Sequence, residues 1–215
     1  MLTRENLEQL RTEYMRRGLT ETDVSPNPFA QFRTWFEDLL YTEPTEPTAM
    51  TLATSTKSGS VSVRTVLMKG FDEKGFIFFS NYDSRKGKEL TENPQAALLF
   101  YWMDLGRQVR IEGRVEKLSR EESKRYFHSR PRESQIGAWT SQQSSVIASR
   151  KILEEEYTQM QNKFAGKEIP LPPFWGGFSL APLQFEFWQA RPNRLHDRIL
   201  FTKKNDSWKT ERLAP

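Results

Sequence analysis

Two arginines and one of the chain's two histidines stand within five residues, in Arg194-Leu195-His196-Asp197-Arg198. A guanidinium can hold a phosphate through two parallel hydrogen bonds or stack on a flat ring. An imidazole changes its charge near neutral pH. The segment follows an aromatic, strand-like run at 184–188. Taken alone, it fits either a site for a flat, anionic, heteroaromatic ligand or a solvated basic turn.

A second candidate site lies where a helix is predicted to begin at Ser84. Ser84 is a suitable N-cap, but the next turn carries Arg85, Lys86 and Lys88. Cations at a helix N-terminus cost typically ~0.3–1 kcal/mol each. The helix predicted from Ser119 shows the usual acidic first turn instead. A bound phosphate would explain the difference, because backbone N–H groups and cations would converge on it. The alternative is an exposed basic turn that tolerates the cost.

A third group of polar side chains surrounds the predicted end of a helix at Pro131. Tyr126 and Arg130 are four residues apart, so they can share a helix face, and Ser134 follows in the expected turn. A phenol, a guanidinium and a hydroxyl together can clamp a small phosphate. A packed tyrosine beside a solvated arginine is the alternative interpretation.

Two further features are weaker by themselves. Arg64 and Lys69 are five apart, so a regular strand would place them on opposite faces unless a bulge intervenes. Ser144 follows Gln143 and is expected to cap a helix over 144–165, which would provide another helix N-terminus for polar ligand atoms. Trp188 ends its predicted strand and could cover a ring, or be an ordinary buried tryptophan.

The composition limits the kinds of site and the classes of protein to which these residues can belong. The 215 residues suffice for one domain, and 15 Phe and 6 Trp supply large buried areas. The sequence holds no cysteine and only 2 histidines, so no metal site is expected. No apolar run could cross a bilayer, and the charged N-terminus lacks a secretory signal, so we expect a cytoplasmic protein without a membrane partner. The net charge of +4 comes from interspersed charges, which favours phosphorylated small molecules over nucleic acid.

Local patterns predict the elements that must position these side chains. Turn signals at 57–60 and 72–75 predict two hairpins, and 42–47 is expected to be a linker. Many antiparallel strands with inserted helices indicate an α+β barrel or sandwich. Helices are expected at 3–17, from Pro28 with an aromatic face, and at 84–92, 119–129 and 144–165. Strands are expected at 49–56, 61–71, 75–81, 95–103, 107–118, 177–189, 197–203 and 207–212.

Together these motifs closely resemble the pyridoxamine 5′-phosphate oxidase family, FMN enzymes of vitamin B6 salvage. The resemblance runs from about residue 5 to the last residue. It rests on the stretches at 64–69, 84–86, 126–132, 134–139, 141–145, 172–177, 186–189, 194–198 and 212–215. It implies a mainly β (α+β) fold, an FMN-binding split β-barrel with peripheral helices. Residues 1–215 would form a single domain, with 1–48 a helical N-terminal extension. The resemblance also implies a homodimer with FMN at the interface.

The resemblance assigns roles by matching position. FMN contacts would be Arg64, Thr65, Val66, Leu67, Met68, Lys69, Phe79, Ser80, Arg85, Lys86, Gln108, Gln143, Ser144, Trp188 and Arg198. Substrate contacts would be Arg11, Tyr14, Lys69, Tyr126, Arg130, Ser134, Arg194, Leu195 and His196. Arg194 and His196 would face the reacting side of the substrate as the catalytic pair. Phe79-Ser80 departs from the Tyr-Thr that is common in the family, but Ser80 keeps the hydroxyl.

The reaction that the resemblance implies is oxidation of pyridoxamine or pyridoxine 5′-phosphate to pyridoxal 5′-phosphate. O2 would reoxidise the flavin with release of H2O2, and ammonia would leave from the amine substrate. Another FMN enzyme on the same barrel, such as a flavin reductase, is the first alternative. It would need the FMN contacts but not the second phosphate clamp. A basic RNA-binding or flavin-storage protein is a non-enzymatic alternative, which the lack of a continuous basic-aromatic surface pattern disfavours.

Overall fold

The computed structural model describes residues 18–215, so the helix expected at 3–17 lies outside the described residues. The chain divides into two compact units. The terminal unit comprises residues 18–47, Leu99–Ile111 and Leu183–Pro215. The central unit comprises Thr48–Leu98 and Glu112–Pro182. Three strands contribute residues to both units: β5 (Gln95–Trp102), β6 (Arg107–Lys117) and β7 (Trp175–Gln189).

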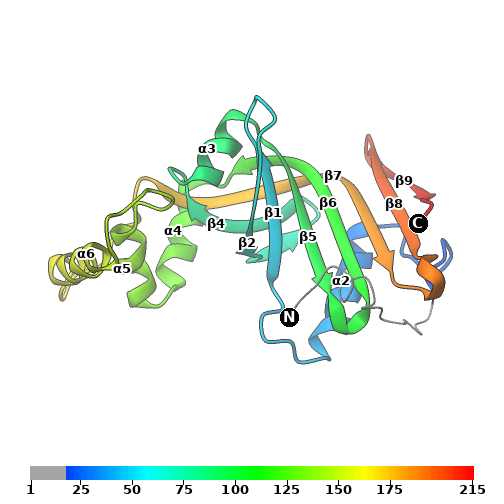
Figure 1. The fold of residues 1–215 in the computed structure, drawn as a ribbon, viewed down its shortest axis with the longest axis horizontal. Helices are drawn as coiled ribbons and strands as arrows, with labels where there is room; N and C mark the ends of the chain where they lie inside the picture. The colour runs from blue at the N-terminus through cyan, green and yellow to red at the C-terminus, as the bar shows by residue number, and fades with distance from the viewer. Residues whose placement is uncertain (1–17) are drawn as a thin grey trace, which may run out of the picture. The chain divides into compact units, whose positions relative to one another are not determined.

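The central unit is built on a sheet with the strand order β2-β1-β5-β6-β7-β4-β3. The strands new here are β1 (Ala49–Ser55), β2 (Val61–Leu67), β3 (Gly70–Asp72) and β4 (Gly75–Asn81). β1 and β2 form an antiparallel hairpin in which Ser55 faces Val61, and β3 and β4 form a tight one in which Asp72 faces Gly75 (Figure 1). Both predicted hairpins are therefore confirmed.

The helices of the central unit begin at recognisable caps. Helix α3 (Arg85–Glu92) begins after Ser84, whose hydroxyl accepts the Gly87 N–H. Helix α4 (Arg120–Ser129) begins with a capping box between Ser119 and Glu122. Both predicted N-caps are confirmed. Helices α5 (Arg132–Thr140) and α6 (Arg150–Lys163) follow α4 and lie beside one another.

The helix predicted at 144–165 is wrong at its start. Residues 141–149 are irregular and mostly exposed, Ser149 is the N-cap of α6, and Ser144 has a left-handed φ of 75°. Helix α5 was not predicted from the sequence. Pro131 ends α4 but at the same time stands at the N-cap of α5, where a helix needs no backbone N–H from it. A proline read only as a stop signal therefore concealed the start of the next helix.

Aromatic and aliphatic side chains pack the central unit in two places. Across β4 and β7, Phe78 and Phe178 are register partners with stacked rings 5.4 Å apart. A second cluster lies under the helices and is built from Phe127, Ile136, Phe164, Ile169, Leu171 and Trp175. It connects α4 and α5 to the start of β7, so it fixes the backbone that carries Tyr126 and Ser134.

The terminal unit packs one helix on one face of a sheet. Helix α2 (Pro28–Leu40) is capped by the Asn27 side chain and buries Phe29, Phe32 and Trp35. These rings lie 5.0–5.3 Å from Phe185, Phe100 and Phe187 respectively. The expected aromatic face is confirmed. After β7 the chain continues through β8 (Asp197–Lys204) and β9 (Ser207–Arg212), which pair antiparallel. No helix in residues 18–215 is long and apolar enough to cross a membrane.

The aromatic packing under α2 should carry much of the stability of the terminal unit. Phe32 is fully buried, and its ring lies 5.0 Å from Phe100 and 5.9 Å from Trp102. Phe32→Ala should lower the free energy of unfolding by about 3–5 kcal/mol, because it removes the ring and leaves a cavity. Urea unfolding at fixed protein concentration measures this. Leu40→Ala, at a 47% exposed position of the same helix, is the control and should change it by less than about 0.5 kcal/mol. A wild-type midpoint for Phe32→Ala would contradict the packing.

Candidate active site

A cationic cradle forms around the first turn of α3 in the central unit. The Lys86 ammonium donates hydrogen bonds to Gln143 Oε1 (2.6 Å), Ser80 Oγ (3.2 Å) and Ser84 Oγ (3.4 Å). A Cβ at residue 87 would lie 2.2 Å from the Tyr82 carbonyl oxygen, so only glycine lets this turn approach so closely. The structure thus brings together Ser80, Lys86 and Gln143, which lie up to 63 positions apart and which the resemblance assigned to FMN.

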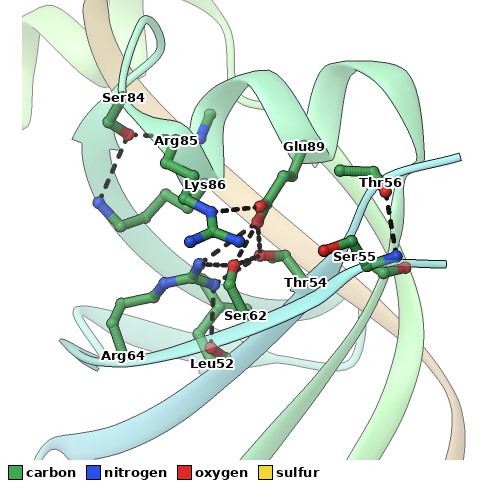
Figure 2. A network of polar contacts seen from close by, with 12 residues as sticks. Leu52, Thr54, Ser55, Thr56, Ser62, Arg64, Ser84, Arg85, Lys86 and Glu89 are labelled. Carbon is green, nitrogen blue, oxygen red and sulfur yellow. Dashed lines mark hydrogen bonds and ion pairs between the residues drawn. The ribbon is translucent and has the colours of Figure 1, made fainter. Parts of the chain in front are cut away.

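Arg64 joins the cradle from β2. Its guanidinium donates to the Leu52 carbonyl oxygen (3.1 Å), to Thr54 Oγ1 (2.6 Å) and to Ser62 Oγ, and it lies 3.3 Å from Glu89 Oε2 (Figure 2). Arg85 reaches the other oxygen of the same carboxylate, with its Nε 2.8 Å from Glu89 Oε1. We define the cradle as Arg64, Ser80, Ser84, Arg85, Lys86 and Gln143, with Glu89 as its acidic neighbour.

Glu89 is not among the predicted site residues, although one local signal for its pairing with Arg85 was present. Glu89 stands four residues after Arg85 on a predicted helix, the spacing of a helical ion pair. The link to Arg64 could not be found this way, because it depends on β1 and β2 packing beneath α3. The structure also adds Thr54 and Ser62, whose hydroxyls donate to Glu89 Oε2 at 2.5 and 2.6 Å.

The charges of the cradle shift the pKa values of its members. Burial lowers the pKa of Lys86 to about 8, and repulsion from Arg64 adds to this, while Glu89 opposes it. Burial by itself would raise the pKa of Glu89, but hydrogen bonds from Ser62, Thr54 and Arg85 outweigh it and bring the pKa to about 2. Near pH 7 the carboxylate is therefore ionised and Lys86 is still mostly protonated.

The segment 64–69 is not one regular strand, so the expected strand at 61–71 is wrong. β2 ends at Leu67 and β3 begins at Gly70. Between them the Met68 N–H donates to the Thr48 carbonyl and the Lys69 N–H to the Ile77 carbonyl, each 2.8 Å away. Because Met68 bonds to the residue before β1 and Lys69 bonds to β4, the pleat is interrupted, and the face of Lys69 does not follow from its spacing to Arg64. Thr65 and Lys69 are exposed, Val66 and Leu67 are half-buried, and Met68 is buried.

A second site in the central unit gathers aromatic rings around Arg130. The rings of Phe79 and Tyr126 stack at 3.8 Å, and Tyr126 lies parallel to Trp175 at 6.2 Å. The Arg130 guanidinium lies 4.7 Å from the centre of the Trp175 ring. Burial raises the pKa of Tyr126, and Arg130 partly opposes this. The phenol therefore stays protonated at neutral pH and can donate a hydrogen bond.

Arg130 carries the strongest sign of an anion-binding site. Its buried Nη1 atom has no hydrogen-bond partner among residues 18–215. Leaving a charged donor buried and unpaired is costly, and a phosphate oxygen is the acceptor that a guanidinium prefers. Ser134 lies in the first turn of α5 rather than in the expected turn, so a helix N-terminus is added to this group.

The opening motif lies in the terminal unit and is partly strained. Asn193 and Arg194 have φ values of 58° and 61°, in the left-handed region that non-glycine residues seldom occupy, a strain that is typical of functional sites. Arg194 and Leu195 are exposed. The His196 ring lies 4.5 Å from the Trp188 ring, and its Nδ1 accepts the Arg191 N–H at 3.1 Å.

The contacts of His196 define its protonation state. Because a backbone N–H can only donate, Nδ1 is unprotonated and Nε2 carries the hydrogen. Burial lowers the pKa of His196, and repulsion from Arg194 adds to this, while Asp197 opposes it. The imidazole is therefore neutral at pH 7, with its Nε2–H as a hydrogen-bond donor.

Arg198 is fixed by a buried acid. It pairs with Trp188 across β7 and β8, and its Nε lies 2.8 Å from Glu186 Oε1. A second bond, at 2.7 Å, joins its Nη1 to the Ala214 carbonyl oxygen. Glu186 also pairs with Arg110 at 2.6 Å. Gln108 lies half-buried on β6 in the same unit.

The predicted site residues thus fall into two described sets. Gln108, Trp188, Arg194, Leu195, His196 and Arg198 belong to the terminal unit, and the remaining described ones belong to the central unit. Arg11 and Tyr14 lie outside the described residues.

Comparisons with known proteins identify the family. Residues 36–164 match the family model described as pyridoxamine 5′-phosphate oxidase. Residues 175–215 match the pyridoxine 5′-phosphate oxidase C-terminal dimerisation region. Among curated proteins, a pyridoxine/pyridoxamine 5′-phosphate oxidase of a Nostoc species is 56% identical over 207 residues, covering 96% of this chain and 97% of that protein. The Burkholderia mallei protein of the same name is 57% identical over 212 residues, covering 97% and 99%.

Solved structures agree with this assignment. PhzG from Burkholderia lata, in complex with tetrahydrophenazine-1-carboxylic acid, has a TM-score of 0.85 at 31% identity and covers 90% of this chain and 95% of its own. An FMN-binding protein from Nostoc punctiforme shares the fold at 17% identity, with a TM-score of 0.68 and coverage of 86% and 97%. The predicted fold class, mainly β (α+β) and of the split-barrel type with peripheral helices, is confirmed. The chain is a member of the pyridoxine/pyridoxamine 5′-phosphate oxidase family.

Proposed function

We propose that this chain oxidises pyridoxamine 5′-phosphate or pyridoxine 5′-phosphate to pyridoxal 5′-phosphate, with FMN as cofactor and O2 as electron acceptor. H2O2 is released, together with ammonia from the amine substrate. The observation that carries the proposal is the presence of two separate cationic sites in the central unit, the cradle and the Arg130 site. A flavin mononucleotide and a B6 phosphate ester each bring one phosphate, and the two sites supply one anion-binding place for each.

The donor set of the cradle fits FMN. Arg64, Arg85 and Lys86 supply the positive charge, and Ser80 and Gln143 supply neutral hydrogen-bonding groups beside it. We assign the flavin ring to the backbone at 64–69 and, in the terminal unit, to Gln108, Trp188 and Arg198. Ser144 and Phe79 complete the assignment. When bound, FMN supplies a ring that accepts two electrons and a proton from the substrate.

The Arg130 site is assigned to the substrate phosphate. Arg130 has the unpaired donor, the Tyr126 phenol remains protonated, and Ser134 opens a helix. Lys69 is exposed at the interruption between β2 and β3 and adds a further cation. Holding the phosphate fixes the position of the ring relative to the groups that act on it.

Arg194 and His196 are proposed as the catalytic pair, with Leu195 and the N-terminal Arg11 and Tyr14 as further substrate contacts. The neutral His196 can donate its Nε2–H to a ring substituent of the substrate. The exposed guanidinium of Arg194 can cover the flat pyridine ring. The left-handed backbone at Arg194 sets the direction in which its side chain leaves the loop.

The assembly and location of the chain are part of the proposal. The match of residues 175–215 to a dimerisation region supports a homodimer with FMN at the subunit interface. We propose that the whole chain acts as one FMN-binding domain in the cytoplasm, with 1–48 as a helical extension. A flavin reductase is the second candidate, but it would have no use for the unpaired Arg130 donor.

The proposed reaction is tested by adding pyridoxamine 5′-phosphate to the FMN-loaded protein in air-saturated buffer. We expect one H2O2 for each pyridoxal 5′-phosphate formed, and little reaction with unphosphorylated pyridoxamine, because only the ester engages Arg130. Pyridoxal 5′-phosphate absorbance and a peroxide assay give the two yields. NADH-dependent flavin reduction without any oxidation of B6 compounds would favour the flavin reductase instead.

Loss of the Arg130 charge should weaken substrate binding selectively. Arg130→Met keeps much of the aliphatic packing on Trp175 but removes the charge-assisted hydrogen bonds, which are worth about 1.5–3 kcal/mol. We therefore expect the KM for pyridoxamine 5′-phosphate to rise about 10- to 100-fold with FMN content unchanged. Steady-state kinetics and the flavin absorbance of the purified protein measure both. Arg125→Ala, at an exposed position of α4, the helix that Arg130 caps at its C-terminus, is the control and should leave KM unchanged. An unchanged KM in Arg130→Met would refute the assignment.

FMN binding should weaken as the pH rises through about 8. The pKa of Lys86 is lowered to about 8, so its ammonium is present below that pH and is lost above it. The phosphate of FMN is a dianion throughout this range, since its second pKa is about 6. We expect the Kd of FMN to rise about twofold from pH 7 to 8 and then by up to about tenfold per pH unit. Fluorescence titration of the apo-protein measures it. Lys86→Arg keeps the charge and should remove the rise, and a rise of equal size in both proteins would exclude Lys86 as its source.

A further inference from the structure

A buried acid lies against the cationic cradle, where an anionic ligand is expected. The Glu89 side chain is only 5% exposed, and it belongs to α3, the helix that also carries Arg85 and Lys86. A carboxylate at this place repels a phosphate, so it needs a compensating role.

The contacts of Glu89 are divided between its two oxygens (Figure 2). Oε1 receives the Nε–H of Arg85 at 2.8 Å. Oε2 receives the hydroxyls of Thr54 and Ser62 at 2.5 and 2.6 Å and lies 3.3 Å from the Arg64 guanidinium. Donors from β1, β2 and α3 thus meet at one carboxylate, which is ionised at neutral pH because its pKa is about 2.

Glu89 compensates for the repulsion between two arginines. The side chain of Arg64 is only 19% exposed, so burial lowers its pKa; Glu89 opposes this, and the nearby Arg85 charge adds to it. With only cations at this place, the two guanidiniums would move apart. Because each binds one side of the same carboxylate, both stay at the cradle before a ligand arrives. A binding site that is ordered in advance loses less entropy when the ligand binds.

The charge balance of the cradle supports the same role. Arg64, Arg85 and Lys86 carry three positive charges and Glu89 one negative charge, which leaves a net charge of two. A phosphate monoester carries about −1.5 to −2 at pH 7. Since two guanidiniums already contact Glu89, its remaining repulsion of a phosphate is small compared with the loss of two oriented cationic donors.

We propose that Glu89 is a positioning residue for phosphate binding, which holds Arg64 and Arg85 in place for the phosphate of the flavin cofactor. The proposal rests on the proposed function only in that the ligand of the cradle is FMN. It predicts a selective effect: replacing Glu89 weakens binding of the phosphorylated flavin more than binding of the same ring system without phosphate.

The experiment compares FMN with riboflavin, which lacks the phosphate, in fluorescence titrations of the refolded apo-protein. Glu89→Gln keeps the size of the side chain and removes its charge. We expect the Kd of FMN to rise at least tenfold and the Kd of riboflavin to change less than twofold. Glu92→Gln removes the same charge from an exposed position of the same helix and should change neither value. Thermal unfolding of each apo-protein shows how much folded protein was titrated.

Every other result of these titrations also decides whether Glu89 positions the arginines. Unchanged or tighter FMN binding in Glu89→Gln, or equal weakening of both flavins, would overturn the positioning role while leaving FMN as the cofactor. A wild-type protein that binds neither flavin would overturn the proposed function and, with it, this role. If Glu89→Gln does not fold, Glu89→Asp takes its place, because the shorter side chain keeps the charge but draws the carboxylate away from Arg64 and Arg85. A selective loss of FMN affinity then supports the role, and an unchanged ratio of the two affinities overturns it.

Discussion

Cations that lie close together repel one another unless an anion lies between them, and in the central unit a buried carboxylate is that anion. The Glu89 carboxylate accepts Arg85 on one oxygen and lies within 3.3 Å of Arg64 on the other. Its position in turn requires α3 to lie over β1 and β2, where Thr54 and Ser62 complete its hydrogen bonds. The closeness of α3 to the chain before it, possible only with a glycine at position 87, is part of the same constraint.

In the terminal unit, too, a buried carboxylate binds an arginine. Glu186 is 2% exposed and pairs with both Arg198 and Arg110, so Arg198 is held on the sheet by a buried carboxylate. The neighbouring His196 is neutral instead, because burial and repulsion from Arg194 lower its pKa. In each unit a basic residue expected to touch a ligand is thus held by an acid that is buried within the same unit.

The Arg130 site differs from the cradle in how its cation is held. No acid holds this guanidinium among the described contacts; it lies over Trp175, and one of its nitrogens is buried without a partner. An aromatic face supports a cation without satisfying its hydrogen bonds. The site therefore leaves its donor available, whereas the cradle binds its arginines to protein oxygens beforehand. This difference agrees with a cofactor that stays bound and a substrate that must exchange.

The local sequence determined the elements whose signals act over a few residues. The caps at Ser84 and Ser119, the two hairpins and the aromatic face of α2 all follow from neighbouring residues, and the dispersed motifs identified the family. A residue that belongs to the ends of two helices led to a wrong prediction. Pro131 follows α4 and is also the N-cap of α5, but only the end of α4 was predicted from it. The position of Ser144 in an irregular segment and the interruption at Lys69 also had no local signal.

Only the tertiary structure decided which charges meet. The sequence placed Arg85 and Glu89 one helical turn apart, but Arg64 reaches the same carboxylate from a strand 25 residues earlier. The partner of a buried charge is chosen by packing across the sheet and helix, because an ion removed from water must find its counter-charge wherever the fold brings one. Residue types and spacing therefore pointed to the first turn of α3, and the resemblance added Arg64, Ser80 and Gln143. Only the packing of α3 on β1 and β2 placed the Glu89 carboxylate between Arg64 and Arg85.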